Sequence, residues 1–79
     1  MSLLVIGVSH HNASVDLLER LSLDAPRREN LLAGLCGREN IAEAIVVSTC
    51  NRTEVYVEAL TFHGAVSEVT DLLLEQAGT

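Results

Sequence analysis

The chain is organised around Ala44-Ile-Val-Val-Ser-Thr-Cys-Asn-Arg-Thr-Glu54, in which an apolar run ends abruptly in a polar turn. A second run with alternating apolar residues, Val55-Tyr-Val-Glu-Ala-Leu60, follows at once. Two such runs are typical of neighbouring strands joined by a short hairpin. We therefore expect Cys50, Asn51 and Arg52 near the bend, on a loop that two strands hold rigidly in place.

Cys50 is the candidate for chemistry in this loop. A thiol attacks as its thiolate, which a nearby cation stabilises, and Arg52 lies two positions on, on the same side if the chain stays extended. Arg52 could instead bind a carboxylate through two parallel hydrogen bonds, with the Thr49 hydroxyl and Asn51 amide beside it. Both roles indicate a small anionic acyl substrate. The alternative is that Cys50 is a small buried packing residue, which is commoner for a lone cysteine.

The first strand is predicted over Leu3-Leu-Val-Ile-Gly-Val-Ser9, a continuous apolar run of strand length. We expect it in the middle of the sheet, with Gly7 allowing another backbone to approach closely. His10 and His11 follow in a polar loop. Neither a Cys-x-x-Cys pair nor an acidic partner lies near them, so no metal site is predicted.

Two helices are predicted between the first strand and the hairpin. Ser14 can cap a helix over Val15–Leu21. Asp24 begins the next helix, which Gly37 ends and in which apolar residues recur at helical spacing. Cys36 belongs to that apolar set and is predicted to be a core residue. The Arg27-Arg28-Glu29 cluster beside it is interpreted as a solvated face.

A third helix is predicted over Thr61–Ala77, ended by Gly78. Its expected buried stripe consists of Val66, Val69, Leu72, Leu73 and Ala77. The order strand-helix-helix-strand-strand-helix indicates an α+β, ferredoxin-like split βαβ sandwich that is incomplete, because the last strand is missing. That strand would lie beside Leu3–Ser9, so we expect this chain to self-associate through its first strand.

Two motifs together carry a resemblance to a known family. They are Ser48-Thr-Cys-Asn-Arg-Thr-Glu54 after one strand and Gly7-Val-Ser-His-His-Asn-Ala13 after another. From Leu3 to about Glu58 the chain resembles the N-terminal catalytic domain of glutamyl-tRNA reductase. The resemblance implies that residues 1–79 are the N-terminal part of that domain, without the NADPH-binding and dimerisation domains.

The family resemblance implies a reaction and a role for each motif residue. Such enzymes reduce the glutamyl group of glutamyl-tRNA to glutamate-1-semialdehyde with NADPH, for tetrapyrrole (porphyrin and heme) synthesis. Cys50 would be the catalytic nucleophile that forms a thioester with that group. Arg52, with Thr49 and Asn51, would bind the substrate side-chain carboxylate, and His10 would line the pocket.

The resemblance also implies partners. The full-length enzyme would use NADPH and form a homodimer, whereas this chain alone would bind no cofactor and be inactive as a reductase. Glutamate-1-semialdehyde aminotransferase would be a downstream partner. With a net charge of −6 and only five Lys and Arg residues, this segment should meet only the aminoacylated end of the tRNA. No apolar stretch approaches the roughly 18 residues of a membrane span, which favours a cytoplasmic protein.

The sequence also departs from the family pattern. Ser14, Leu18 and Leu23 stand where the family usually has proline, an arginine and an aromatic residue, so the role of that arginine does not carry over. A reading from a different class is a small ferredoxin-like ligand-binding or regulatory module in which Cys50 is structural. Faster alkylation of Cys50 than of Cys36 would separate the two readings.

Overall fold

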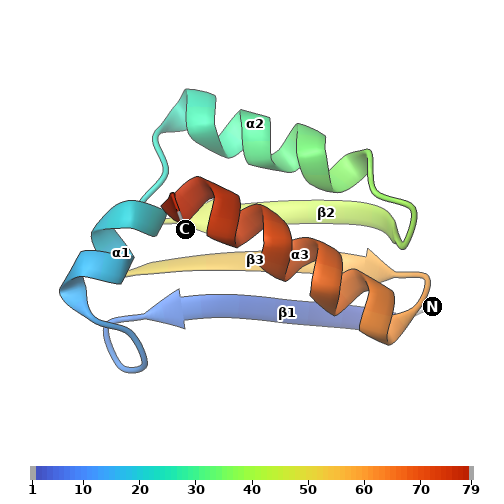
Figure 1. Ribbon diagram of the computed structural model, residues 1–79, viewed down its shortest axis with the longest axis horizontal. Coiled ribbons are helices and arrows are strands. Elements are labelled where there is room, and N and C mark those ends of the chain that lie inside the picture. Colours follow the sequence, from blue (N-terminus) through green and yellow to red (C-terminus); the bar gives the residue numbers. More distant parts are fainter. Residues whose placement is uncertain (1, 79) are drawn as a thin grey trace.

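A computed structural model describes residues 2–78 of the chain as three strands and three helices (Figure 1). In chain order they are β1 (Ser2–Ser9), α1 (Val15–Leu21), α2 (Ala25–Cys36), β2 (Ile41–Ser48), β3 (Arg52–Ala59) and α3 (Phe62–Ala77). The predicted order of elements is confirmed. The hairpin strand β3 begins earlier than predicted, at Arg52.

The sheet has the order β1-β3-β2, and both outer strands run antiparallel to β3. β1 and β2 are therefore parallel to each other with β3 between them, as in a split βαβ unit. All three helices cover one face (Figure 1), which gives an open α+β sheet. The prediction that β1 lies in the middle is wrong for the described residues, because β3 takes that place and β1 pairs only with it.

The faces of the sheet are set by alternation along β3. Its odd-numbered residues from Thr53 to Ala59 are buried beneath the helices, whereas Arg52 is exposed and Glu54 only partly buried on the other face. Gly7 of β1 lies against this strand, and a Cβ atom there would stand 2.9 Å from the Thr53 carbonyl oxygen. The predicted close approach of another backbone at Gly7 is confirmed.

The helices begin and end at the signals that the sequence predicts. Ser14 Oγ accepts a hydrogen bond from the Leu17 N–H group at 3.2 Å, and Asp24 Oδ1 accepts one from the Arg27 N–H group at 3.0 Å. Gly78 ends α3 with a φ angle of 79°, in the left-handed region that favours glycine.

Two helix faces differ from the prediction. Cys36 is exposed, so its assignment to the core was wrong. Leu35 takes the buried position, and each step along a helix turns the side chain by about 100°.

On α3, Ala65 is buried and Val66 is only half-buried, whereas the other expected positions are buried as predicted: Val69, Leu72, Leu73 and Ala77. Leu18 and Leu23, which depart from the family pattern, are both buried apolar residues.

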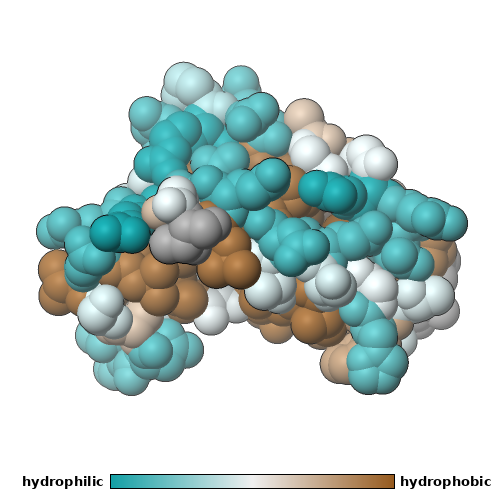
Figure 2. Space-filling view, viewed as in Figure 1, coloured by the Kyte–Doolittle hydropathy of each residue, from teal (hydrophilic) through white to brown (hydrophobic). Residues whose placement is uncertain are grey.

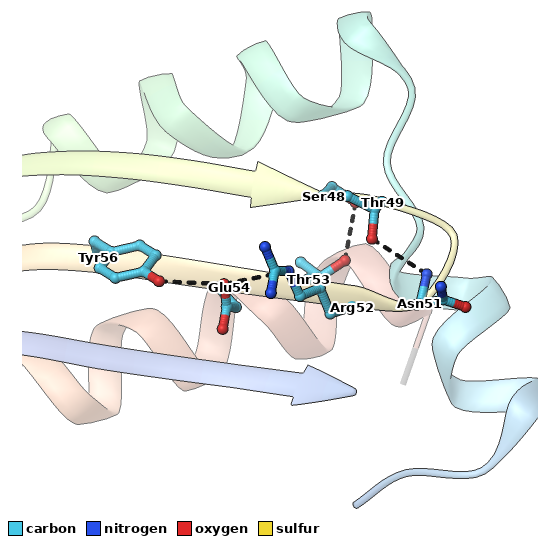
Figure 3. Close-up of polar contacts among 7 residues, drawn as sticks. All are labelled: Ser48, Thr49, Asn51, Arg52, Thr53, Glu54 and Tyr56. Carbon is cyan, nitrogen blue, oxygen red and sulfur yellow. Dashed lines mark hydrogen bonds and ion pairs between the residues drawn. The ribbon is translucent and has the colours of Figure 1, made fainter. Parts of the chain in front are cut away.

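A chain of hydrogen bonds ties the linker between α1 and α2 to the base of the hairpin. Thr53 is the one buried polar side chain among residues 2–78, and its hydroxyl donates to the Leu21 carbonyl oxygen at 2.6 Å. A hydroxyl has a single hydrogen, so in the 2.9 Å contact between Thr53 and Ser48 the donor is Ser48 (Figure 3). Ser48 Oγ in turn accepts from the Leu23 N–H group at 3.0 Å.

Arg27 connects the ends of two helices. Its Nη2 donates to the Arg20 carbonyl oxygen at 2.9 Å and to the Gln76 carbonyl oxygen at 2.8 Å. Both acceptors lie in last turns, where helix carbonyls lack partners within the helix and carry partial negative charge. The interpretation of Arg27 as a solvated residue was therefore wrong, because its guanidinium holds the ends of α1 and α3 together.

We predict that Thr53→Val lowers the free energy of unfolding by about 1–3 kcal/mol, measured by urea denaturation. The substitution keeps the shape but leaves the Leu21 carbonyl and the Ser48 hydroxyl without their partner in a place shielded from water. Thr70→Val, at an exposed position on α3, is the control and should stay within about 0.5 kcal/mol of the unmodified chain. Equal stability of the two variants would remove Thr53 from this role.

A second prediction concerns Arg27. Arg27→Met should destabilise the fold by roughly 1–3 kcal/mol, because charge-assisted hydrogen bonds to two helix ends are lost while the aliphatic stem is kept. Arg28→Met is the matched control, since Arg28 is the next residue of α2 and is exposed. Thermal unfolding of both variants measures the difference. The same melting temperature for both would contradict the role.

Candidate functional site

The hairpin between β2 and β3 forms one side of the candidate site. The Thr49 N–H group donates to the Arg52 carbonyl oxygen at 2.8 Å and closes the turn. Thr49 Oγ1 accepts from the Asn51 N–H group at 3.2 Å, which fixes the bend from inside (Figure 3). Cys50 and Asn51 therefore form the tip, and the prediction that they lie near the bend is confirmed.

The loop after β1 forms the other side. The His10 N–H group donates to the Asn51 carbonyl oxygen at 3.1 Å, so the two loops are joined directly. Asn12 Oδ1 accepts from the Ser9 N–H group at 2.8 Å, and Ser9 Oγ accepts from the His11 N–H group at 3.2 Å. The His10 and His11 rings lie 3.9 Å apart between centroids. The two sequence motifs, 41 positions apart between His10 and Asn51, thus lie side by side.

An open hollow of about 580 Å³ lies where the two loops meet the sheet. It is lined by Ser9, His10, His11, Thr49, Asn51, Arg52 and Glu54. All four residues predicted to bind substrate or to line a pocket are therefore brought together: His10, Thr49, Asn51 and Arg52. Their side chains supply hydrogen-bond donors and one fixed positive charge, a combination suited to a small anion.

Arg52 forms a partly exposed ion pair with an acidic neighbour that sequence reasoning did not assign. Arg52 Nε lies 3.6 Å from Glu54 Oε1, and the Tyr56 hydroxyl donates to the same oxygen at 3.2 Å (Figure 3). The contact uses Nε, so among residues 2–78 the two Nη atoms of Arg52 have no hydrogen-bond partner. The signal that could have revealed Glu54 and Tyr56 is the alternation of β3, which places every second residue on this face.

Cys50 lies at the tip of the hairpin and is exposed. It does not line the hollow, although Thr49 and Asn51 on either side of it do. The argument that Arg52 lies on the same side as Cys50 requires an extended chain, and the chain turns at Cys50, so that argument fails. The exposure of Cys50 also disagrees with the alternative reading as a buried packing residue.

Within the described residues, no three His, Cys, Asp or Glu side chains lie where they could share a metal ion. No helix in the same range is long and apolar enough to cross a membrane.

Comparison with known proteins gives a consistent family. Residues 6–79 match the model of the family described as "Glutamyl-tRNAGlu reductase, N-terminal domain". Over 78 residues, or 99% of this chain, the sequence is 47% identical to "Glutamyl-tRNA reductase 1" of Nocardioides sp.. It is equally identical over the same length to the glutamyl-tRNA reductases of Corynebacterium glutamicum strain R and Corynebacterium diphtheriae.

These relatives are much longer than the chain. It spans 18% of the Nocardioides and C. diphtheriae proteins and 17% of the C. glutamicum protein. The two motifs that form the hollow lie within the matched residues. Because residues 6–79 match the family model and 99% of the chain aligns with these relatives, the chain belongs to the glutamyl-tRNA reductase family, through that family's N-terminal domain.

Proposed function

We propose that this chain is the N-terminal catalytic segment of an NADPH-dependent glutamyl-tRNA reductase, whose product is the glutamate-1-semialdehyde used in tetrapyrrole synthesis. The observation that carries the proposal is the hairpin tip, where an exposed thiol lies between two residues of a hollow that also contains a fixed cation. The relatives are named for a tRNA-dependent reduction, and that name agrees with a site for a small anionic acyl group.

Cys50 is the proposed nucleophile. Its thiolate sulfur would attack the ester carbonyl carbon that joins glutamate to the tRNA, forming a C–S bond and breaking the C–O bond. The electron pair goes to the ribose oxygen, which takes up a proton as the tRNA leaves. An exposed position on a rigid turn suits this step, because a bulky aminoacylated end can reach the sulfur. NADPH would supply the hydride that reduces the resulting thioester and returns the thiol.

NADPH would be bound outside these 79 residues. A dinucleotide site of the usual kind needs a glycine-rich turn between a strand and a helix, where the backbone can approach the pyrophosphate. The segment between β1 and α1 contains no glycine after Gly7, whose place is taken up by its contact with β3. The connection between β3 and α3 has a single nearby glycine, Gly64, so neither strand-to-helix connection of this chain has the glycine-rich turn that such a site needs.

Arg52 is the proposed anchor for the substrate side-chain carboxylate. Glu54 holds Nε, which leaves both Nη atoms for a two-point contact. Thr49 Oγ1 already accepts one hydrogen bond, so its own hydrogen remains available for a carboxylate oxygen. The Asn51 side chain lies in the same hollow, and His10 would line its opposite wall. Glutamine lacks the matching charge and would be rejected.

The wider assembly follows from the same proposal. The chain would contact the aminoacylated end of the tRNA, and more basic parts of the full-length enzyme would hold the rest, because this segment has a net charge of −6. The full-length enzyme would be a cytoplasmic homodimer. Its aldehyde product is reactive, so glutamate-1-semialdehyde aminotransferase is the expected downstream partner.

We predict that Cys50→Ser in the full-length enzyme lowers glutamyl-tRNA-dependent NADPH oxidation by several orders of magnitude. A hydroxyl without a dedicated base is a far weaker nucleophile than a thiol. Cys36→Ser is the matched control, since both cysteines are exposed, and it should keep most of the activity. Substantial turnover by the Cys50 variant would refute the thioester mechanism.

A further prediction concerns Arg52. Arg52→Lys should lower kcat/KM for glutamyl-tRNA roughly 10- to 100-fold, because an ammonium cannot make the planar two-point contact. Arg38→Lys, at an exposed position between α2 and β2, should leave kcat/KM unchanged. Steady-state kinetics over a range of glutamyl-tRNA concentrations gives both values. Unchanged kinetics for Arg52→Lys would exclude Arg52 from substrate binding.

A further inference from the structure

Glu54 lines the same hollow as Arg52, although its negative charge would repel a carboxylate. The two residues are two positions apart on β3, so both side chains lie on the face of the sheet away from the helices. Figure 2 shows the helix-covered side of the molecule instead, where hydrophilic residues gather over α2. Glu54 Oε1 lies 3.6 Å from Arg52 Nε. The position of Glu54 therefore suits a role that acts through Arg52.

The Glu54 carboxylate has a second donor on the same strand. The Tyr56 hydroxyl donates to Glu54 Oε1 at 3.2 Å, and this is the oxygen that faces Arg52 Nε (Figure 3). Tyr56 is half-buried, and its cross-strand neighbours are Val5 on β1 and Ile45 on β2. Aliphatic neighbours on both sides limit the directions that the Tyr56 ring can take. One carboxylate oxygen is therefore approached from two directions.

Gly7 leaves the space that the Glu54 side chain occupies. The two residues lie directly opposite each other in the ladder between β1 and β3. A Cβ atom at position 7 would lie 3.0 Å from Glu54 Cγ and 3.3 Å from Glu54 Cα. These distances are shorter than ordinary contacts between carbon atoms, so a side chain at position 7 would displace Glu54. The first residue of one motif therefore decides where the last residue of the other motif can lie.

The contact at Nε has a specific consequence for a planar guanidinium group. A carboxylate can bind two N–H groups of an arginine either along the edge formed by Nε and one Nη or along the edge formed by both Nη atoms. Glu54 lies at the first edge of Arg52, and within residues 2–78 no group bonds to the second. Both Nη atoms then face in one direction. A substrate carboxylate is thereby limited to one orientation in the hollow.

We propose that Glu54 is the positioning residue that makes Arg52 select a carboxylate over an amide. The inference rests on the proposed role of Arg52 as substrate anchor and extends it to Glu54, Tyr56 and Gly7. In a fixed direction, the Nη edge requires two acceptor oxygens side by side, which a glutamyl side chain offers. A glutaminyl side chain offers one oxygen and an NH2 group that would face a second donor. A guanidinium free to turn could bind that single oxygen, so selectivity would fall.

The charge of Glu54 also acts on the substrate directly, with the opposite sign. If orientation did not matter, removing a negative charge from the hollow would favour a carboxylate, because like charges repel. The Arg52 cation lies between Glu54 and the Nη edge, and it offsets this repulsion. Loss of orientation costs one of two charge-assisted hydrogen bonds, which are roughly twice as strong as neutral ones. We therefore expect the orientation effect to be the larger one.

Steady-state kinetics of Glu54→Gln in the full-length enzyme tests the proposal. KM for glutamyl-tRNA should rise about tenfold with kcat within about twofold, since the side-chain carboxylate is bound alike in the ground and transition states. Turnover of the same tRNA charged with glutamine should change by less than about twofold, so discrimination falls about tenfold. A KM for glutamyl-tRNA that is unchanged or lower would overturn the proposal, because the charge effect would then be at least as large as the orientation effect.

Two further variants complete the experiment. Glu58→Gln is the matched control, because Glu58 lies on the same face of β3 but does not line the hollow, and it should leave the kinetics with both substrates unchanged. In the Arg52→Lys enzyme, adding Glu54→Gln should raise KM no further, because no guanidinium remains to be oriented. Additive effects of the two substitutions would overturn the proposal and leave Arg52 in the substrate site. Unchanged kinetics for Arg52→Lys alone would instead reject the proposed substrate role on which the inference rests.

Discussion

The buried hydroxyl of Thr53 is the constraint on which the arrangement of the site depends. It lies at the start of the central strand and bonds both to Ser48 on β2 and to the Leu21 carbonyl at the end of α1. The turn between Ser48 and Thr53 is therefore anchored to the helix layer through these hydrogen bonds. Without that support, the bend would be held only by the hydrogen bonds among its own residues and by the one from the His10 N–H group to the Asn51 carbonyl oxygen.

The seven-residue motif divides into two sets by the alternation of the strands. Ser48 and Thr53 face the helices and support the turn, whereas Arg52 and Glu54 face the hollow. Only some residues of the motif are therefore placed to contact a ligand, although all seven are adjacent in the sequence. The sequence alone indicated that this motif belongs to the candidate site. The structure was needed to show which of its side chains face the helices and which face the hollow.

Features set by neighbouring residues could be predicted from sequence, and features set by distant residues could not. Ser14, Asp24 and Gly78 mark helix ends because each acts on its own turn. The position of β1 at the edge depends on where β3 inserts, 43 or more residues later. Arg27 bonds to the Gln76 carbonyl, 49 positions away, which no local pattern indicates. His10, Thr49, Asn51 and Arg52 do lie around one hollow, but Glu54 was not assigned to it, and the direction of Cys50 depended on the turn itself.

The hydrogen bond from Arg27 to the last turn of α3 also fixes the position from which a longer polypeptide would continue. Through Arg27 the end of α3 is fixed beside the end of α1, at the same end of the sheet as the hairpin tip (Figure 1). A domain joined after α3 would thus have its attachment point at the end of the sheet where the hollow lies. In a protein of the relatives' length, the polypeptide that continues from α3 would therefore start close to the residues that line the hollow.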